Sequence, residues 1–221
     1  MSDLEPEEFV IIRQKKYHGY WATKSIIILS FISLLAQQIY PKLIYYFGLN
    51  PVRLFENGWV WQPITYQFLH GGVLHLLFNM FLLWFLGRRL EEIWGSGKFL
   101  RYYLICGIGA GLLSAVVSPA TTIGASGAIY GILVAYGITF PNEYLYLYLI
   151  FPIKAKNLVV IFAIIEFVLS ITSPGDNIAH SAHLAGMFVG IIYLKFGNII
   201  GNYKNRRKIG KYVERLNEEK F

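Results

Sequence analysis

The chain has 221 residues, of which 55% are hydrophobic and only 15% are charged. A soluble domain averages about 25% charged residues, so this composition argues against a soluble globular enzyme and against a disordered chain. The net charge of +7 fits either nucleic acid or an anionic membrane surface as a partner, and the positions of the charges must decide between them.

Apolar segments long enough to cross a membrane recur along the whole chain, since a span needs about 20 mostly apolar residues. A loop at 41–67, rich in aromatic residues and proline, has a composition suited to the membrane interface. The predicted fold class is an all-α membrane protein with a bundle of six transmembrane helices. We expect a tail at 1–21, a membrane domain at 22–197 and a basic tail at 198–221. The expected spans lie near residues 22–40, 68–86, 98–118, 124–140, 157–173 and 180–197.

The basic residues lie almost entirely on one side of this arrangement, and Lys42 and Arg53 are the two exceptions. Because cytoplasmic loops are enriched in Lys and Arg, both termini are expected in the cytoplasm. The basic cluster at 204–208 fits an anionic lipid surface better than a nucleic acid. We therefore expect the lipid bilayer, and no nucleic acid, among the partners.

Polar residues from three distant parts of the sequence fall at a similar depth below the expected outer surface. His75, Ser126 and His183 follow the starts of spans two, four and six, each within roughly 10 Å of its outer end at about 1.5 Å per residue. A serine nucleophile needs a general base and hydrogen-bond donors for the oxyanion. His183 is the candidate base, and His75 shares one helix face with Asn79, so both can donate to an oxyanion. These residues favour serine–histidine chemistry.

Other intramembrane chemistries fit the sequence less well. An aspartyl membrane protease needs two aspartates within the membrane, but Asp3 and Asp176 both lie outside the expected spans. No histidine is followed by glutamate, as a zinc protease of the His-Glu-x-x-His type requires. A haem or zinc site built from the histidines stays open as an alternative, although no carboxylate is evident beside them. Glu166, deep in span five, is interpreted as a buried structural group, with a functional partner as the alternative.

These motifs together resemble the rhomboid family of intramembrane serine proteases. The segments that carry the resemblance are 68–80, 87–97, 124–131 and 182–190. The resemblance implies that Ser126 is the nucleophile and His183 the base, as a pair without a carboxylate. It also implies an oxyanion hole formed by the Ser126 backbone N–H with His75 and Asn79, and no cofactor or metal.

Two further roles follow from the same resemblance. Tyr130 is expected to pack against the base, and Gly124 to contribute a backbone group near the scissile carbonyl. One departure concerns the loop before span two, where many family members carry Trp-Arg and this chain has Trp61-Gln62. Glutamine can still hydrogen-bond backbone carbonyls, but without a charge.

Glycines recur at a spacing of four residues in two of the expected spans. This spacing lets two membrane helices approach closely, so we expect spans four and six to hold Ser126 against His183. The glycines concerned are Gly127 and Gly131 in span four and Gly186 and Gly190 in span six.

The functional expectation is an intramembrane serine endopeptidase that cleaves single-span membrane proteins near the outer end of their transmembrane segment. The expected location is the bacterial cytoplasmic (inner) membrane. Two alternatives stay open: a non-catalytic rhomboid-like protein that binds or escorts membrane clients, and a transporter or channel with a histidine proton relay.

Overall fold

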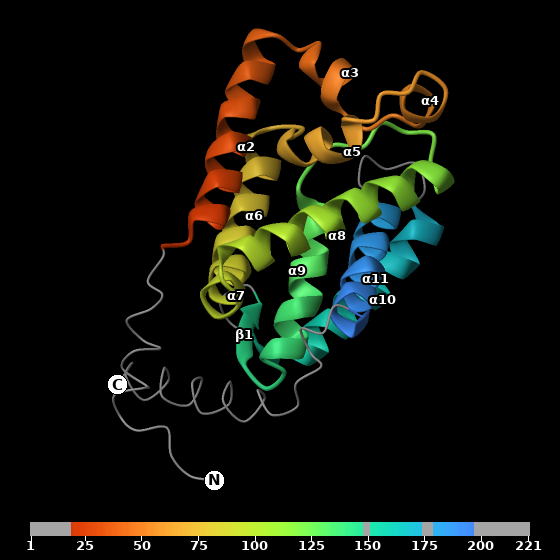
Figure 1. The fold of residues 1–221 in the computed structure, drawn as a ribbon. Coiled ribbons are helices and arrows are strands. Elements are labelled where there is room, and N and C mark those ends of the chain that lie inside the picture. The colour runs from red at the N-terminus through yellow and green to blue at the C-terminus, as the bar shows by residue number, and fades with distance from the viewer. Residues whose placement is uncertain (1–18, 148–150, 174–178, 197–221) are drawn as a thin grey trace.

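The computed structural model describes residues 19–147, 151–173 and 179–196, and these form a bundle of helices (Figure 1). Within these ranges, four helical segments are long and apolar enough to cross a membrane: α2 (Trp21–Ile39), Val73–Trp94, α8 (Ser96–Val117) and α10 (Ala155–Thr172). Helix α9 (Ser126–Thr139) is apolar but shorter, and α11 (His180–Phe196) has 17 residues. Many large apolar side chains on the outer faces of the helices are exposed, as expected for a protein that contacts lipid.

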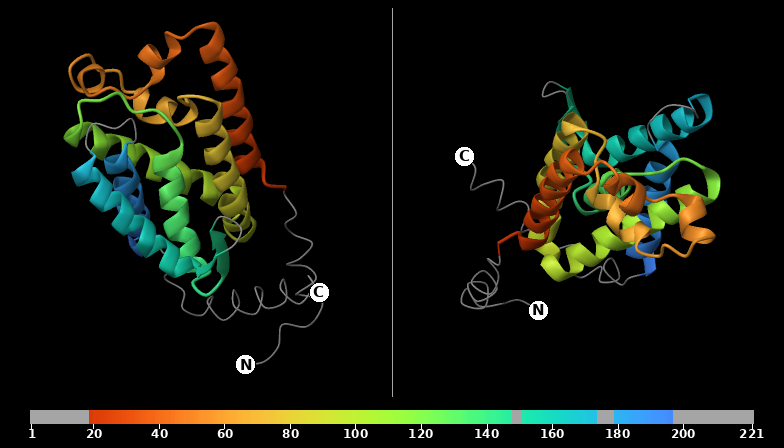
Figure 2. Two further views of the ribbon diagram at one scale, coloured as in Figure 1. Left: turned by 180° about the vertical axis from the view of Figure 1, so that it is seen from behind. Right: turned by 90° about the horizontal axis from the view of Figure 1, so that it is seen from above.

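Helix α9 lies between α6 (Val73–Leu82) on one side and α10 and α11 on the other, with α8 crossing over it (Figure 1). Figure 2 shows the same order from behind. Most residues of α9 are buried, as expected for a helix that is apolar on all sides. An irregular segment, 118–125, leads into it from the end of the bundle that carries the 41–67 loop. Ser126 is therefore the first residue of the central helix.

The second span begins and ends later than expected, so the boundaries 68–86 are wrong. The helix starts at Val73 and continues through a π-helical turn, η2 (Leu83–Gly87), into α7 (Arg88–Trp94). Its start is delayed because the backbone of His70 is bound by the Gln37 side chain, whose Nε2 donates to the His70 carbonyl at 2.9 Å. The Gln37 Oε1 accepts from the His70 N–H at 3.1 Å, so both backbone groups are paired outside a helix.

The 41–67 loop is folded into short helices that are tied together by polar contacts. They are α3 (Leu43–Phe47), α4 (Pro51–Phe55) and α5 (Gln62–Thr65), followed by the 3₁₀ turn η1 (Tyr66–Phe68). Gln62 is fully buried; its Oε1 accepts from the Asn50 N–H at 3.0 Å and its Nε2 donates to the Tyr46 carbonyl at 3.3 Å. The uncharged side chain at this position therefore braces the loop from both sides.

A small β-hairpin joins α9 to α10, which corrects the expectation of a purely helical fold. Strands β1 (Tyr144–Leu147) and β2 (Phe151–Lys154) are antiparallel, with Tyr144 opposite Lys154. The alternating Tyr-Leu-Tyr-Leu of β1 has the period of two that favours a strand. An ion pair between Glu143, just before β1, and Arg89 of α7 joins this end of the hairpin to the bundle.

Candidate active site

The site is centred on a contact between α9 and α11. The Ser126 Oγ lies 2.8 Å from the His183 Nε2, although the two residues are far apart in the sequence. Ser126 is half-buried, whereas His183 is 7% exposed. The serine can be reached from outside the bundle while its histidine partner is held in the interior, which is an arrangement suited to an activated nucleophile.

The two helices approach closely because both faces carry glycine. A Cβ added to Gly186 would lie 1.9 Å from the Gly127 carbonyl oxygen, and one added to Gly190 would lie 3.2 Å from the Gly131 Cα. The Tyr102 hydroxyl of α8 donates to the Gly131 carbonyl at 2.7 Å, so a third helix also stabilises the contact between α9 and α11. The glycines singled out in the sequence thus lie where the two helices meet.

Tyr130, one turn after the serine on α9, packs flat on the candidate base. The Tyr130 and His183 rings are stacked, with centroids 4.3 Å apart and planes inclined by 13°. The His180 ring meets His183 edge-on, with centroids 6.1 Å apart and planes at 90°. The imidazole therefore has little freedom to turn away from the serine.

A carboxylate lies on the far side of this imidazole, where none was evident from the sequence. The Glu166 Oε2 is 3.0 Å from the His183 Nδ1 and 2.5 Å from the His180 Nδ1. The Tyr130 hydroxyl donates to the other oxygen of the same carboxylate. The carboxylate that was not evident beside the membrane histidines is therefore Glu166, which α10 turns inward, and the alternative of a functional partner gains support over a purely structural group.

The same group of residues offers the atoms that a metal ion binds. One ligand atom from each of Glu166, His180 and His183 lies within 4.8 Å of the others, and all three residues are buried. A carboxylate and two imidazoles form a ligand set that zinc accepts.

His75 on α6 faces the serine across Gly124. The Gly71 N–H donates to the His75 Nδ1 at 3.3 Å, so a neutral His75 carries its proton on Nε2. A Cβ added to Gly124, which has φ of +120°, would lie 3.0 Å from that Nε2 and 3.9 Å from the Ser126 Oγ. The absence of a side chain at Gly124 thus leaves room for an imidazole donor beside the nucleophile.

Asn79 is placed less directly than the resemblance implies. Its Nδ2 donates to the His75 backbone carbonyl at 2.9 Å, and the residue is 3% exposed. A side-chain amide has two N–H groups, so the second is available to an oxyanion. Asn79 therefore stabilises the helix turn that carries His75, and its second side-chain N–H remains available to bind an oxyanion.

The segment before the serine is tied to the rest of the bundle by Tyr66. The Gly124 N–H donates to the Tyr66 carbonyl at 2.9 Å, and the Tyr66 hydroxyl donates to the Gly107 carbonyl of α8 at 2.6 Å. Burial raises the pKa of the Tyr66 hydroxyl well above its usual range, so it stays a neutral donor. The loop, α8 and the start of α9 thus hold one another in place.

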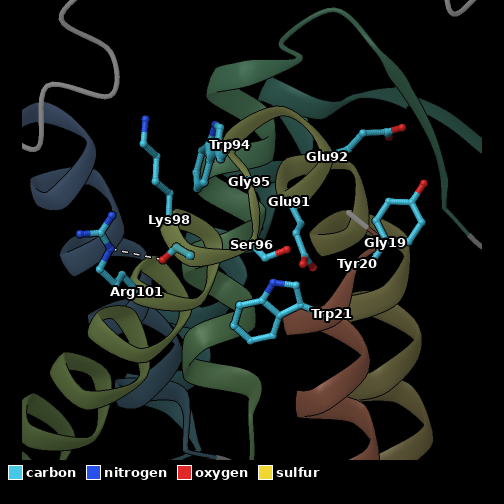
Figure 3. Close-up of a pocket in the computed structure, with 11 residues that line it drawn as sticks. Gly19, Tyr20, Trp21, Glu91, Glu92, Trp94, Gly95, Ser96, Lys98 and Arg101 are labelled. Carbon is cyan, nitrogen blue, oxygen red and sulfur yellow. Dashed lines mark hydrogen bonds between the residues drawn. The ribbon is translucent and has the colours of Figure 1, made fainter. Parts of the chain in front are cut away.

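A separate pocket of about 440 Å³ lies at the other end of the Val73–Trp94 segment (Figure 3). Glu91 lines it, about 24 Å beyond His75 at about 1.5 Å per residue. The carboxylate of Glu91 accepts from the Ala22 and Thr23 N–H groups at 3.0 and 2.9 Å and from the Thr23 hydroxyl at 2.6 Å. This pocket surrounds the capped start of α2 and is distant from Ser126.

Comparison with known proteins gives a consistent family assignment. The family model described as Rhomboid domain matches residues 57–197. The Rhomboid protease GluP of Bacillus subtilis is 36% identical over 146 residues, which is 65% of this chain and 27% of the relative. RHOMBOID-like protein 5 of Arabidopsis thaliana is 36% identical over 148 residues, covering 64% of this chain and 47% of the relative. The Rhomboid protease GlpG of Salmonella paratyphi A is 32% identical over 147 residues, with 64% and 49% covered. The chain thus spans less than half the length of each of these three relatives.

Proposed function

The chain belongs to the rhomboid family, and we propose that it is an intramembrane serine endopeptidase in which Ser126 is the nucleophile and His183 the general base. The observation that carries the proposal is the 2.8 Å contact between the Ser126 Oγ and the His183 Nε2. The family is known for intramembrane serine proteases, and the relatives named as rhomboid proteases agree with this chemistry.

The catalytic cycle follows from the positions of these groups. The Ser126 Oγ attacks the scissile carbonyl carbon while the His183 Nε2 accepts the hydroxyl proton and later gives it to the leaving amine. Water, deprotonated by the same nitrogen, then hydrolyses the acyl-enzyme. The Ser126 N–H is unpaired within the helix because the residue is the first of α9, and it donates to the oxyanion with His75 and Asn79.

The proposed topology has six membrane crossings with both termini in the cytoplasm. The distribution of Lys and Arg supports this orientation, and it places the start of α9 toward the outer side. The four long apolar helices show an integral membrane protein, and α9 and α11 supply the two remaining spans. The bacterial cytoplasmic membrane is the proposed location. The proposed domain limits, at residues 21–22 and 197–198, lie close to or outside the described residues.

The proposed substrates are single-span membrane proteins, cut near the outer end of their transmembrane segment. A helical substrate hides its carbonyls in hydrogen bonds, so the segment must unwind before Ser126 can attack it. The half-buried position of Ser126 supports entry of an extended segment from the outer side. The remaining proposed partner is the lipid bilayer, and nucleic acid has no part in the proposal.

The test is cleavage of a reporter transmembrane substrate by the purified protein in liposomes. Ser126→Ala and His183→Ala are expected to abolish cleavage, whereas Ser33→Ala on α2 retains it. A serine-reactive fluorophosphonate is expected to label the wild type and the Ser33 variant but not Ser126→Ala. Equal cleavage by the wild type and Ser126→Ala would overturn the proposal.

A further inference from the structure

We propose that Glu166 is a positioning residue for the base, and that its carboxylate keeps the proton of His183 on Nδ1 so that Nε2 can accept the serine proton. This inference rests on the proposed function. It gives the serine–histidine pair a third member, contributed by a different helix, which the resemblance did not imply.

The first argument is the burial of the carboxylate. Glu166 is 5% exposed and lies within α10, where a charged group is costly unless donors surround it. Three polar groups do so: the Tyr130 hydroxyl contacts Oε1, and the Nδ1 atoms of His180 and His183 lie 2.5 and 3.0 Å from Oε2. These groups belong to α9 and α11, the two helices that carry Ser126 and His183.

The second argument is the tautomer that this contact selects. An ionised carboxylate accepts hydrogen bonds and donates none, so it favours the imidazole with its proton on Nδ1. The His183 Nε2 then presents a lone pair to the Ser126 hydroxyl at 2.8 Å, as a general base must. The opposite tautomer would point an N–H at the serine and could not accept its proton.

The contact between Glu166 and His183 is close but poorly aligned. The Glu166 Oε2 and the His183 Nδ1 are 3.0 Å apart, but they are not oriented as a hydrogen bond requires. Among the described residues, the His183 Nδ1 has no hydrogen-bond partner. Such contacts are often loose before substrate binds and tighten during the reaction. As His183 becomes an imidazolium, its attraction to the carboxylate increases and favours better alignment.

The third argument is the way in which α10 joins the bundle. It is the least buried of the four long helices, and its buried residues are Ala155, Leu158 and Glu166. Ala155 and Leu158 lie in the first turn of α10, so Glu166 is the one buried residue in the C-terminal half of this helix. Tyr130 stacks on His183 and donates to Glu166, so one side chain orients both the carboxylate and the base.

The decisive variant is Glu166→Gln, which removes the charge and keeps the shape. We expect kcat to fall by at least about tenfold with KM within twofold of the wild type, and fluorophosphonate labelling of Ser126 to slow in parallel. The comparable Asp-to-Asn change in a soluble triad keeps the geometry but costs about 10⁴-fold, because the amide favours the wrong tautomer of the histidine, so a tenfold loss is the minimum that this role predicts. The matched control Tyr130→Phe keeps the stacked ring and the charge and loses one donor to Glu166, so its loss in kcat is expected to be smaller.

Several outcomes would overturn the inference. The first is a kcat for Glu166→Gln within twofold of the wild type, and the second is a change in this variant that is confined to KM. The third is a stoichiometric metal ion that is present in the purified wild type and lost in Glu166→Gln. A purely structural role predicts a lower melting temperature with a normal labelling rate per folded molecule. If Ser126→Ala still cleaves, the proposed function itself fails; if it is inactive and Glu166→Gln is fully active, only the positioning role fails.

A second measurement does not depend on whether Glu166→Gln folds. In the wild type labelled with ¹⁵N-histidine, the His183 signals can be assigned by comparison with His183→Ala. We expect a protonated Nδ1 and an unprotonated Nε2 at neutral pH. A protonated Nε2 with an unprotonated Nδ1 would overturn the proposal even if Glu166→Gln unfolded.

Discussion

The peptide oxygen of Gly127 occupies the place where a side chain on Gly186 would begin, since a Cβ there would lie 1.9 Å from that oxygen. This contact sets the separation of α9 and α11, and those helices carry Ser126 and His183. The 2.8 Å between the Ser126 Oγ and the His183 Nε2 therefore depends on two residues that have no side chains.

Gly186→Ala is expected to lower kcat by about 10²-fold, because the added methyl must push the two helices apart and misplacement of about 1 Å has a cost of that order. The peptide backbone of Gly127 cannot move aside as a flexible side chain could. The measurement is the cleavage rate of the reporter substrate, with Gly97→Ala as the matched control, since no atom lies within 4 Å of a Cβ at Gly97. Equal rates for the two variants would show that the crossing is not rigid.

His75→Ala and Asn79→Ala are each expected to reduce kcat by about 10²- to 10³-fold with little change in KM, as for the loss of one oxyanion donor. The larger loss is expected for His75, because its Nε2 lies beside Gly124 and Ser126, whereas one Asn79 N–H is used by the His75 carbonyl. Steady-state kinetics in liposomes would measure both values. Asn157→Ala, an exposed asparagine on α10, is the control, and a rise in KM alone would contradict the oxyanion role.

The depth of the polar residues could be predicted from the sequence, and their contacts only in part. The charge distribution placed His75, Ser126 and His183 at one level, and the structure brings Ser126 and His183 into contact. The glycine spacing also indicated which helices approach closely. Both predictions depend on position along a helix, which hydropathy and periodicity report directly.

The contact of Glu166 with the base could not be predicted in the same way. Its depth in span five was evident, but the rotation of α10 about its own axis is set by packing against α9 and α11. Two signals pointed toward it: Glu166 is the carboxylate deep in a span, and His180 lies one helical turn before His183. The β-hairpin and the late start of α6 also depend on local contacts, such as Gln37 with the His70 backbone.

Glu91→Ala is expected to destabilise the fold without changing the chemistry at Ser126. The substitution leaves the Ala22 and Thr23 N–H groups without their acceptor, which costs about 3 kcal/mol for buried groups that were bonded to a charge. Thermal unfolding in detergent should show a lower melting temperature than for Glu92→Ala, a half-buried neighbour on α7. The kcat of the folded protein at low temperature should match the wild type, and a selective loss of kcat would contradict this separation of roles.

Gln62→Arg tests whether the arginine that the family resemblance implies at this position can replace the glutamine found here. Gln62 is fully buried and both accepts from the Asn50 N–H and donates to the Tyr46 carbonyl. Arginine has donors and no acceptor, so the Asn50 N–H would lose its partner at a cost of about 1–3 kcal/mol. We expect a lower melting temperature and faster proteolysis within residues 41–67, with Gln38→Arg, at an exposed site on α2, behaving as the wild type. If Gln62→Arg were as stable as Gln38→Arg, the loop would have to rearrange around the guanidinium, and the bracing contacts of Gln62 would not be required for its fold.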